Sequence, residues 1–454
     1  MSYLKKIKIQ NYKGFQDEQV IEMGIPIDGR SGLTIICGKN NSGKSTVIDA
    51  SLKLSNDSLI SEEERQNNKV VNIQFENERG ENLVLQNLDN GALITKIGNW
   101  IDSSKFEIIN SNRNWSDSFN PGTLTYELYK ANRGETVIKS PIDGIFGAYL
   151  STIATDKARK LRLNELMKRV FPEFNDWTID QNQGGAFIKY TTKNGLEHKA
   201  GMLGQGVVST MKILGYLDTD RNDKILFIDE PELALHPQAQ KNLAEIFYEI
   251  SLQKQVILIT HSPYFIDWKQ VTKKAVINRI SKPEDNYCIS SILKNDNANL
   301  IGKIGKITSQ RDMPFLLDTT GKELFFADNI IFCEGQDDVA ILKNFIEKSC
   351  IKVNFDIFGF GVASADNMIH YLGLAKSLNI KAGALFDSPF VNKKQENVER
   401  AYNQCVEGFG EISIIQHHSQ DDISKVVTGI EIKPEFETEF RKIIQNFNDF
   451  FNKK

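Results

Sequence analysis

One stretch decides the fold of this 454-residue chain: Gly38-Lys39-Asn40-Asn41-Ser42-Gly43-Lys44-Ser45. It has the spacing G-x-x-x-x-G-K-S and follows an apolar run at residues 33–37, which predicts a buried strand. Residues 46–52 predict a helix directly after the loop. Successive backbone N–H groups of such a loop surround phosphates, and the helix N-terminus adds the positive end of its dipole. The stretch therefore predicts a nucleotide-binding loop.

The positions of this loop have expected roles toward ATP and Mg²⁺. Gly43 lets the backbone come close to the phosphates. The ammonium group of Lys44 reaches the β- and γ-phosphates, and the hydroxyl of Ser45 is a ligand for Mg²⁺. A glycine-rich turn without a ligand is the plainer interpretation, so a second nucleotide motif is needed. The loop residues assigned to ATP are Asn40, Asn41, Ser42, Gly43, Lys44, Ser45 and Thr46.

The second motif is a pair of acids after an apolar run, residues 224–228 followed by Asp229 and Glu230. Unpaired carboxylates are costly at the end of a buried strand, and a bound Mg²⁺ compensates for them. We expect Asp229 to hold the metal through water and Glu230 to orient and deprotonate the attacking water. A third apolar run, residues 255–260, delivers His261 to the same sheet edge, where it can contact the γ-phosphate. Glu230 and His261 are thus the expected catalytic residues.

These motifs resemble the ABC-type ATPases of the RecF/SMC and OLD families over the N-terminal two thirds of the chain. Residues 229–237 read D-E-P-E-L-A-L-H-P, and the L-H-P is typical of the OLD type. Residues 4–15 end in N-Y-K-G-F and resemble the first strand of the same families. The resemblance implies an ATPase head that uses ATP and Mg²⁺.

The signature loop of these ATPases corresponds to residues 201–209, with Gly204, Gln205 and Gly206 assigned to ATP. It lacks the L-S-G-G-Q of transporters. In the families that the chain resembles, this loop covers the γ-phosphate bound to a second subunit. The resemblance therefore implies a homodimer or higher homo-oligomer formed through the ATPase heads.

A second strand, turn and helix pattern lies at residues 329–342, where E-G-x-x-D places Glu334 at a strand end and Asp338 in the next helix. It resembles the first motif of a Toprim domain, the metal-binding α/β module of topoisomerases, primases and OLD nucleases. A later apolar strand, residues 382–386, ends at Asp387. The resemblance assigns Glu334, Asp338 and Asp387 to a divalent metal.

The later strand departs from the Toprim pattern D-x-D, because this chain has Asp387-Ser388-Pro389. Proline offers no side-chain oxygen to a metal. Asp421 and Asp422 could substitute, although their spacing does not require it. We therefore predict an α/β chain with an ABC-type (RecF/SMC/OLD-like) P-loop ATPase head at residues 1–321. A smaller, degenerate Toprim-like α/β domain follows at residues 322–454.

Smaller elements are predicted around these motifs. A helical insertion at about 141–175 contains a basic run, residues 157–171, which is either a phosphate-tracking stripe for DNA or a solvated helix face. Arg113 lies where related ATPases often have an arginine close to the nucleotide. The helical spacing of apolar residues at 436–451 predicts a helix packed on its own domain. Strand-like pieces predict a small antiparallel sheet beside the nucleotide: residues 70–76, 82–88, 91–97 and 105–110.

Composition limits the remaining possibilities. Hydrophobic residues make up 40% of the chain, which is ample for buried cores, and the net charge of −4 means that nucleic-acid binding depends on a local patch. No apolar run approaches the ~18–20 residues of a membrane span. The N-terminus lacks a secretory apolar segment, so we predict a cytoplasmic protein that does not associate with membranes. The five cysteines form no C-x-x-C pair, which argues against a zinc site.

An OLD-like ATPase joined to a motif-poor Toprim region is similar to the PtuA family, the ATPase subunits of Septu-type antiphage defence, in which a separate chain provides an HNH nuclease. The first hypothesis is thus a bacterial defence subunit that binds and hydrolyses ATP and controls a partner HNH nuclease acting on DNA. The second is a self-contained OLD-type endonuclease that uses the three Toprim-like acids. A RecF-like DNA repair ATPase is the third, and a transporter ATPase has the least support.

Overall fold

The structure is a computed structural model of the chain, and the chain divides into two compact units. The first unit comprises residues 1–278 and 285–288, and the second comprises residues 279–284 and 289–454. The predicted boundary at residues 321 and 322 stays a prediction. The structure describes residues 2–54, 59–66, 69–87, 92–102, 105–111, 150–182, 185–199, 204–217, 224–267, 275–282, 287–293, 322–359, 365–387, 413–420 and 422–452.

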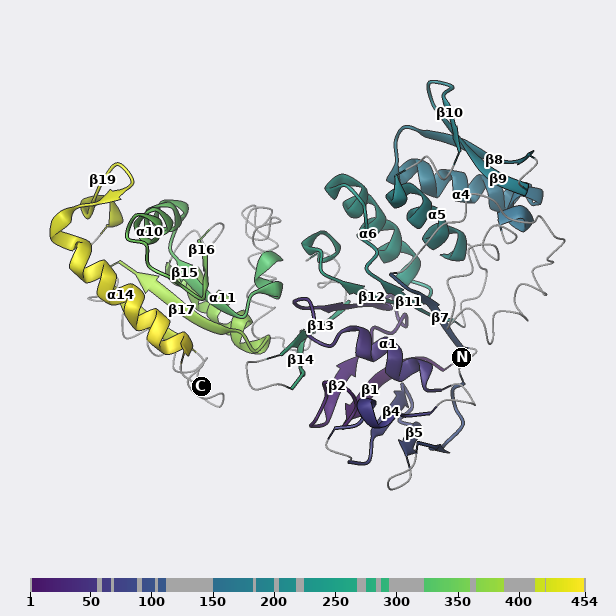
Figure 1. Ribbon diagram of the computed structural model, residues 1–454, viewed down its shortest axis with the longest axis horizontal. Helices are drawn as coiled ribbons and strands as arrows, with labels where there is room; N and C mark the ends of the chain where they lie inside the picture. The colour runs from purple at the N-terminus through teal and green to yellow at the C-terminus, as the bar shows by residue number, and fades with distance from the viewer. Residues whose placement is uncertain are drawn as a thin grey trace. The chain divides into compact units, whose positions relative to one another are not determined.

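The first unit is built on a mainly parallel sheet (Figure 1). Its neighbouring strands are, in order, β13 (Val276–Ser281), β3 (Leu33–Cys37), β12 (Gln255–Thr260), β11 (Ile225–Asp229) and β7 (Phe106–Ile109). Every residue of β3, β12 and β11 is buried, as expected for apolar runs covered on both faces. The pairs β3–β12, β12–β11 and β11–β7 are parallel, so these strands end at one edge of the sheet.

Three helices pack on this sheet, and Figure 1 shows α1 (Ser45–Leu52) on one side and α5 (Gln205–Leu217) and α6 (Pro237–Ser251) on the other. α5 is buried along most of its length, which matches its nearly continuous apolar sequence. α6 begins with Pro237 in its first turn and His236 as its N-cap. A short 3₁₀ helix, η4 (Pro263–Phe265), follows β12.

An antiparallel sheet in the order β2-β1-β4-β5-β6 accompanies the first one. β4 and β5 alternate between buried and partly exposed residues, as the period of a half-covered strand requires. One expectation was wrong, because the piece at residues 105–110 forms β7, which pairs in parallel with β11 of the main sheet. The bounds are β1 (Leu4–Gln10), β2 (Gln19–Glu22), β4 (Asn72–Asn77), β5 (Asn82–Asn87), β6 (Ile94–Ile97) and η1 (Glu62–Glu64).

The described part of the predicted insertion is helical at residues 150–155 and in α4 (Lys157–Val170), and a separate hairpin sheet in the order β10-β9-β8 follows it. The helix ends before residue 175 because β8 (Phe174–Asn182) already begins there, followed by β9 (Gly185–Thr192) and β10 (Glu197–Lys199). Two basic residues of the helix have acidic partners: Lys160 pairs with Asp176 at 3.2 Å and Arg169 with Glu249 at 2.7 Å. The basic run is therefore partly neutralised within the first unit.

The second unit has a four-stranded parallel sheet in the order β16-β15-β17-β18. Strands and helices alternate along the chain, as predicted for an α/β module. The elements of this sheet are β15 (Asn329–Cys333), α10 (Gln336–Lys348), β16 (Asp356–Phe358), α11 (Ala365–Ser377), β17 (Lys381–Phe386) and β18 (Ser413–His417).

The C-terminal helix, α14 (Pro434–Asn452), packs on its own unit as predicted. Its residues Phe440, Ile444 and Phe447 are buried in one cluster with Ile331 of β15 and Leu342 of α10. Since burying a large apolar side chain contributes roughly 1.5–3 kcal/mol, this helix is a major part of the core. The remaining short elements are β14 (Ile289–Leu293), η5 (Glu323–Phe326), η6 (Ile423–Lys425), β19 (Val427–Thr428) and β20 (Glu431–Ile432).

Candidate nucleotide site and carboxylate cluster

The loop between β3 and α1 has the backbone shape that its glycines predict. Gly38 and Gly43 have φ angles of 143° and 99°, and Asn41 has a φ angle of 61°. A Cβ atom at Gly43 would lie 2.5 Å from the sulfur of Cys288. Backbone conformation and contact both exclude a side chain, so the loop requires glycine at this position.

Lys44 lies buried inside this loop. Its Nζ atom donates to the carbonyl oxygens of Gly38 at 3.0 Å and Lys39 at 2.6 Å, and to the hydroxyl of Ser42 at 3.4 Å. Burial lowers the pKa of Lys44 to about 8, although nearby acidic groups act in the opposite direction. A buried ammonium whose hydrogen-bond acceptors are all neutral would be stabilised by an anion.

The first turn of α1 adds further donors. The helix has no side-chain cap at its N-terminus. The Thr46 and Val47 N–H groups of its first turn donate to the carbonyl oxygens of Gly43 and Lys44 at 3.1 Å, so a phosphate would share these donors or replace their acceptors. Ser45, Asn40 and Asn41 are exposed at this turn, whereas Thr46 is buried. The loop residues fit ATP, and the exposed Ser45 hydroxyl fits Mg²⁺. Their individual contacts with ATP stay predictions.

The acid pair and the histidine lie at adjacent strand ends, because β11 and β12 are parallel neighbours. Asp229 is buried, and Glu230 follows with a φ angle of 46°. The Glu230 backbone N–H donates to Ile259 of β12 at 2.8 Å. His261 Nε2 lies 3.6 Å from Glu230 Oε1. Burial and the charge of Lys44 lower the pKa of His261, so its imidazole is neutral at pH 7. The structure thus gathers Lys44, the acid pair and His261 around one loop.

Glu232 supports this arrangement and had no role in the sequence analysis. Its carboxylate accepts hydrogen bonds from Thr260 Oγ1 at 2.8 Å and from the His261 backbone N–H at 2.6 Å. Burial raises the pKa of Glu232. The side chain therefore fixes the turn that carries His261. Its position three residues after Asp229 in D-E-P-E was the available signal.

The signature residues lie at the start of α5. Gly204 and Gln205 are exposed, whereas Gly206 is buried against the L-H-P segment. A Cβ atom at Gly206 would lie 2.3 Å from the carbonyl oxygen of Ala234, which itself has a φ angle of 59°. The close approach explains the glycine structurally. Two exposed signature residues suit contact with a second subunit, which stays a prediction.

The N-Y-K-G-F turn is tied to the nucleotide helix by a charged network. Lys13 forms an ion pair with Asp49 of α1. Lys53, at the end of α1, pairs with Glu64 at 2.8 Å, and the Tyr12 hydroxyl donates to the same carboxylate at 3.1 Å. This motif therefore fixes the orientation of the helix that follows the nucleotide loop.

In the second unit, the three predicted acids gather at the carboxyl ends of β15 and β17. Glu334 follows β15, and its Oε1 atom accepts the backbone N–H of Asp387 at 3.1 Å. Asp338, in the first turn of α10, accepts the backbone N–H of Gly335 at 3.0 Å. Burial raises the pKa of Glu334 to about 7 and that of Asp338 to about 6, with the neighbouring carboxylates adding to the effect.

His418 joins this cluster and was missed by the sequence analysis. Its side chain is fully buried, and its Nε2 atom is hydrogen-bonded to Asp387 Oδ1. It follows β18, which lies beside β17, and its own N–H donates to Phe386 at 3.3 Å. A histidine after the apolar pair Ile414-Ile415 was the available signal, but the adjacency of the two strands was not predicted.

The carboxylate cluster does not fit a metal as it stands. Asp387 is hydrogen-bonded to His418, and the other two acids accept backbone N–H groups. Among the described residues, no group of three or more His, Cys, Asp or Glu side chains is placed to hold a metal ion. Asp422 instead caps η6 by accepting the N–H of Ser424 at 2.7 Å. Other predicted positions lie outside the described residues: Arg113, 141–149, 201–203, Ser388, Pro389 and Asp421.

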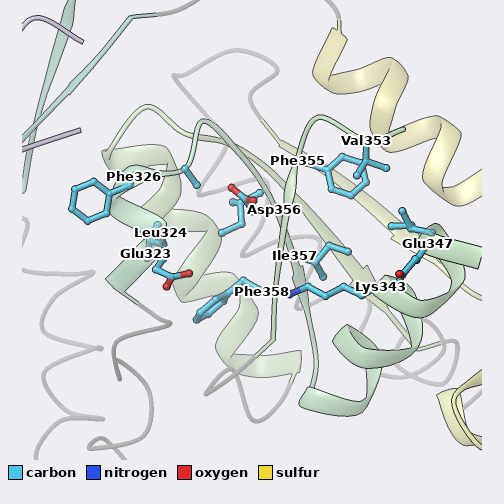
Figure 2. Close-up of a pocket in the computed structure, with 13 residues that line it drawn as sticks. Glu323, Leu324, Phe326, Lys343, Glu347, Val353, Phe355, Asp356, Ile357 and Phe358 are labelled. Carbon is cyan, nitrogen blue, oxygen red and sulfur yellow. The ribbon is translucent and has the colours of Figure 1, made fainter. Parts of the chain in front are cut away.

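A separate cavity of about 530 Å³ lies in the second unit, between η5, α10 and β16 (Figure 2). Its walls are mostly apolar, with Phe355 and Phe358 among them, and Lys343 lies on its lining. None of the three acids of the carboxylate cluster lines this cavity. It is therefore a feature distinct from that cluster.

In the described part of the chain, no helix has the length and apolar character needed to cross a bilayer.

Comparison with known families assigns both units. Residues 3–89 and 93–266 match the family described as AAA ATPase domain. Residues 325–388 match the TOPRIM domain of the family described as overcoming lysogenization defect protein-like. The predicted fold class, an ATPase head followed by a smaller Toprim-like α/β domain, is confirmed.

Individual relatives cover only parts of the chain. An OLD nuclease of Thermus scotoductus is 29% identical over 150 residues, which is 32% of this chain and 27% of that protein. The endonuclease GajA of Bacillus cereus is 25% identical over 233 residues, 46% of this chain and 34% of that protein. The matched parts thus span about a third or less of these relatives.

One solved structure, an Smc head bound to the C-winged helix domain of ScpA, is 17% identical with a TM-score of 0.46, covering 65% of this chain and 99% of that one. The match to the AAA ATPase domain, by contrast, takes in more than half of the chain. The chain therefore belongs to the AAA ATPase domain family.

Proposed function

We propose that this protein is the ATP-binding and ATP-hydrolysing subunit of a bacterial antiphage defence system that regulates a partner nuclease acting on DNA. One observation carries the proposal: in the first unit the buried Lys44 ammonium donates to two carbonyl oxygens and a hydroxyl, all neutral, whereas Asp387 in the second unit is hydrogen-bonded to His418. The names of two relatives, an OLD nuclease and the endonuclease GajA, support a connection to nuclease activity.

In the first unit, the terminal phosphates of ATP would replace the carbonyl oxygens that Lys44 now contacts. Glu230 would hold the attacking water and accept its proton, since its side chain is 36% exposed at the strand end. Neutral His261, beside Glu230, would donate a hydrogen bond to the γ-phosphate. Ser45 and Asp229 would hold Mg²⁺, which neutralises charge on the phosphates when it is bound.

The exposed signature residues Gly204 and Gln205 would contact ATP bound to a second copy of the chain. ATP would then link two heads, which gives the protein a nucleotide-dependent homodimer or higher homo-oligomer. Size-exclusion chromatography with light scattering tests this: Glu230→Gln with ATP should give a larger species than the same variant without ATP. An unchanged mass would argue against ATP-linked association.

The partner is proposed to be an HNH nuclease, as in the Septu-type PtuA family. The test is plasmid cleavage in Mg²⁺ or Mn²⁺ by the purified chain, alone and with the product of a neighbouring HNH gene. We expect cleavage only when both are present. Glu334→Ala and Asp387→Ala should then leave cleavage nearly intact, as should Asp337→Ala, a control at an exposed acid in the same turn.

A second candidate function is a self-contained, ATP-regulated OLD-type endonuclease. It is favoured by the convergence of Glu334, Asp338 and Asp387 at one sheet edge. In that case the purified chain alone should cut DNA with a divalent metal. Substitution of Glu334 or Asp387, but not of Asp337, should abolish cutting while ATP binding persists.

A further inference from the structure

His418 has an unusual place for a histidine beside three carboxylates. Its side chain is fully buried, and its ring stacks on Phe440 of α14 with centroids 5.8 Å apart and planes 26° from parallel. The packing holds the ring so that Nε2 meets Asp387 Oδ1. The histidine therefore reaches the cluster from the hydrophobic core and cannot turn toward solvent without leaving Phe440.

The surroundings of the other ring nitrogen, Nδ1, decide which of the two nitrogens carries the proton. His418 Nδ1 is buried and has no hydrogen-bond partner among the described residues. A buried N–H without an acceptor is costly, so the favoured tautomer has its proton on Nε2. Nε2–H then donates to Asp387, and the single donor of the ring is used on this carboxylate.

The rest of the cluster is also held by protein donors. Asp387 gives its own backbone N–H to Glu334, and Gly335 gives its N–H to Asp338. Each of the three acids thus has an oxygen engaged by a donor of the second unit. Mg²⁺ needs near-octahedral oxygen ligands at short distances, and it would have to displace the His418 contact to use both oxygens of Asp387.

We propose that His418 takes the place of a divalent metal in the Toprim-like unit: its Nε2–H holds Asp387 in position and closes the carboxylate cluster to metal. The inference rests on the proposed function in one respect, namely that nuclease chemistry comes from another chain. The acids then act as a structural cluster at the ends of β15 and β17. His418 is a positioning residue, because it acts on Asp387 and not on a substrate.

The test is a calorimetric titration of Mn²⁺ into the nucleotide-free full chain. We expect no site that depends on Asp387 in the wild-type chain. His418→Ala should gain a Mn²⁺ site that the wild-type chain lacks, because it frees an anionic oxygen ligand. Adding Asp387→Asn to this variant should remove the new site, which assigns it to the cluster and not to the nucleotide loop.

A conservative variant tests whether the hydrogen bond to Asp387 or the packing of the His418 ring keeps Mn²⁺ out of the cluster. The side-chain amide of His418→Gln can place an N–H near the original Nε2 position, so this variant should keep Mn²⁺ out as the wild-type chain does. Tight Mn²⁺ binding by the wild-type chain that is lost in His418→Ala would overturn the proposal, since His418 would then be a ligand.

The proposal stays testable if the His418 variants do not fold. In that case the proposal is tested by comparing the Mn²⁺ titration of the wild-type chain with that of the Asp387→Asn variant. Equal Mn²⁺ titrations of the two support the inference, and a wild-type site that Asp387→Asn removes contradicts it. Neither DNA nor a partner enters these titrations, so their outcome is independent of whether a partner nuclease exists.

Discussion

The two units place charged groups at the same structural position, the carboxyl ends of neighbouring parallel strands, but satisfy them differently. In the first unit, Lys44 donates to two carbonyl oxygens and one hydroxyl. In the second, Asp387 has the ring of His418, and Glu334 and Asp338 have backbone donors. The first set would gain from an outside ligand, whereas the second is already completed by protein groups.

The difference shows that strand topology gathers charged residues without deciding their use. Parallel strands bring their ends to one edge in both sheets. What differs is the loop that follows each strand: a glycine-rich turn with an uncapped helix start in one case, and a turn whose N–H is capped by Asp338 in the other. The contents of the loops therefore separate a ligand site from a structural cluster.

The largest expected effect concerns hydrolysis in the first unit. Glu230→Gln should lower ATP turnover by roughly 10²–10⁴-fold while ATP binding persists, because an amide can position water but cannot accept its proton. Phosphate release measures turnover, and a nucleotide titration measures binding. Glu245→Gln, at an exposed acid of α6, is the matched control. Wild-type turnover in Glu230→Gln would assign the base to another residue.

The second-largest expected effect concerns the affinity for ATP. Lys44→Ala should weaken ATP binding by roughly a hundredfold, since a charge-assisted hydrogen bond contributes about 1.5–3 kcal/mol. The exposed Lys69→Ala serves as the control. The two sites lie in different units, so Mn²⁺ binding at the carboxylate cluster should be the same in Lys44→Ala as in the wild-type chain. Unchanged ATP affinity would be incompatible with the assignment of the nucleotide loop.

Much of both sites could be predicted from the sequence, because short spacings carry them. The nucleotide loop, Asp229, Glu230 and His261 each follow an apolar run that reads as a strand. Glu334 and Asp387 likewise end predicted strands. Local patterns place a residue at a strand end, and parallel strands bring such ends together.

The rest of the fold and of both sites could not be predicted, because it depends on which strands are neighbours. An apolar run does not reveal the neighbours of a strand. Residues 106–109 read as a strand, but only the tertiary structure pairs them with β11 and not with the antiparallel sheet. The contact of His418 with Asp387 likewise requires β18 to lie beside β17. Glu232 was overlooked because its partners, Thr260 and His261, lie at the end of another strand.

Substitution of Gly359 in the second unit tests whether the stability of this unit is separate from ATP binding in the first. A Cβ atom at Gly359 would lie 2.4 Å from Gly335 O and 2.5 Å from Val339 Cγ2, beside the turn that carries Glu334. Gly359→Ala should therefore lower the free energy of unfolding of this unit by about 1–3 kcal/mol. Faster hydrogen exchange of α10 amides measures this.

The control for this substitution is Gly204→Ala, where no atom of the described chain lies within 4 Å of the added Cβ. It should leave amide exchange in both units unchanged. ATP affinity should also stay the same in Gly359→Ala. A parallel loss of ATP affinity would show that the two sites do not act separately.

The smallest expected effect is the pH dependence of ATP binding. Burial lowers the pKa of Lys44 to about 8 in the nucleotide-free chain, so the side chain is charged at pH 7 and mostly neutral at pH 9. ATP binds the charged form. The affinity should therefore fall by about tenfold between pH 7 and 9, with proton uptake on binding at the higher pH.

Lys44→Arg separates this titration from every other pH effect, because a guanidinium stays charged throughout this range. The variant will bind ATP less tightly, since its planar group does not fit the carbonyl acceptors of a lysine. Its affinity should nevertheless be constant from pH 7 to 9. Isothermal titrations of both chains in buffers of different ionisation enthalpy measure affinity and proton uptake together. An equal decline in both chains would assign the pH dependence to a group other than Lys44, and a flat wild-type profile would mean that the loop does not perturb its lysine.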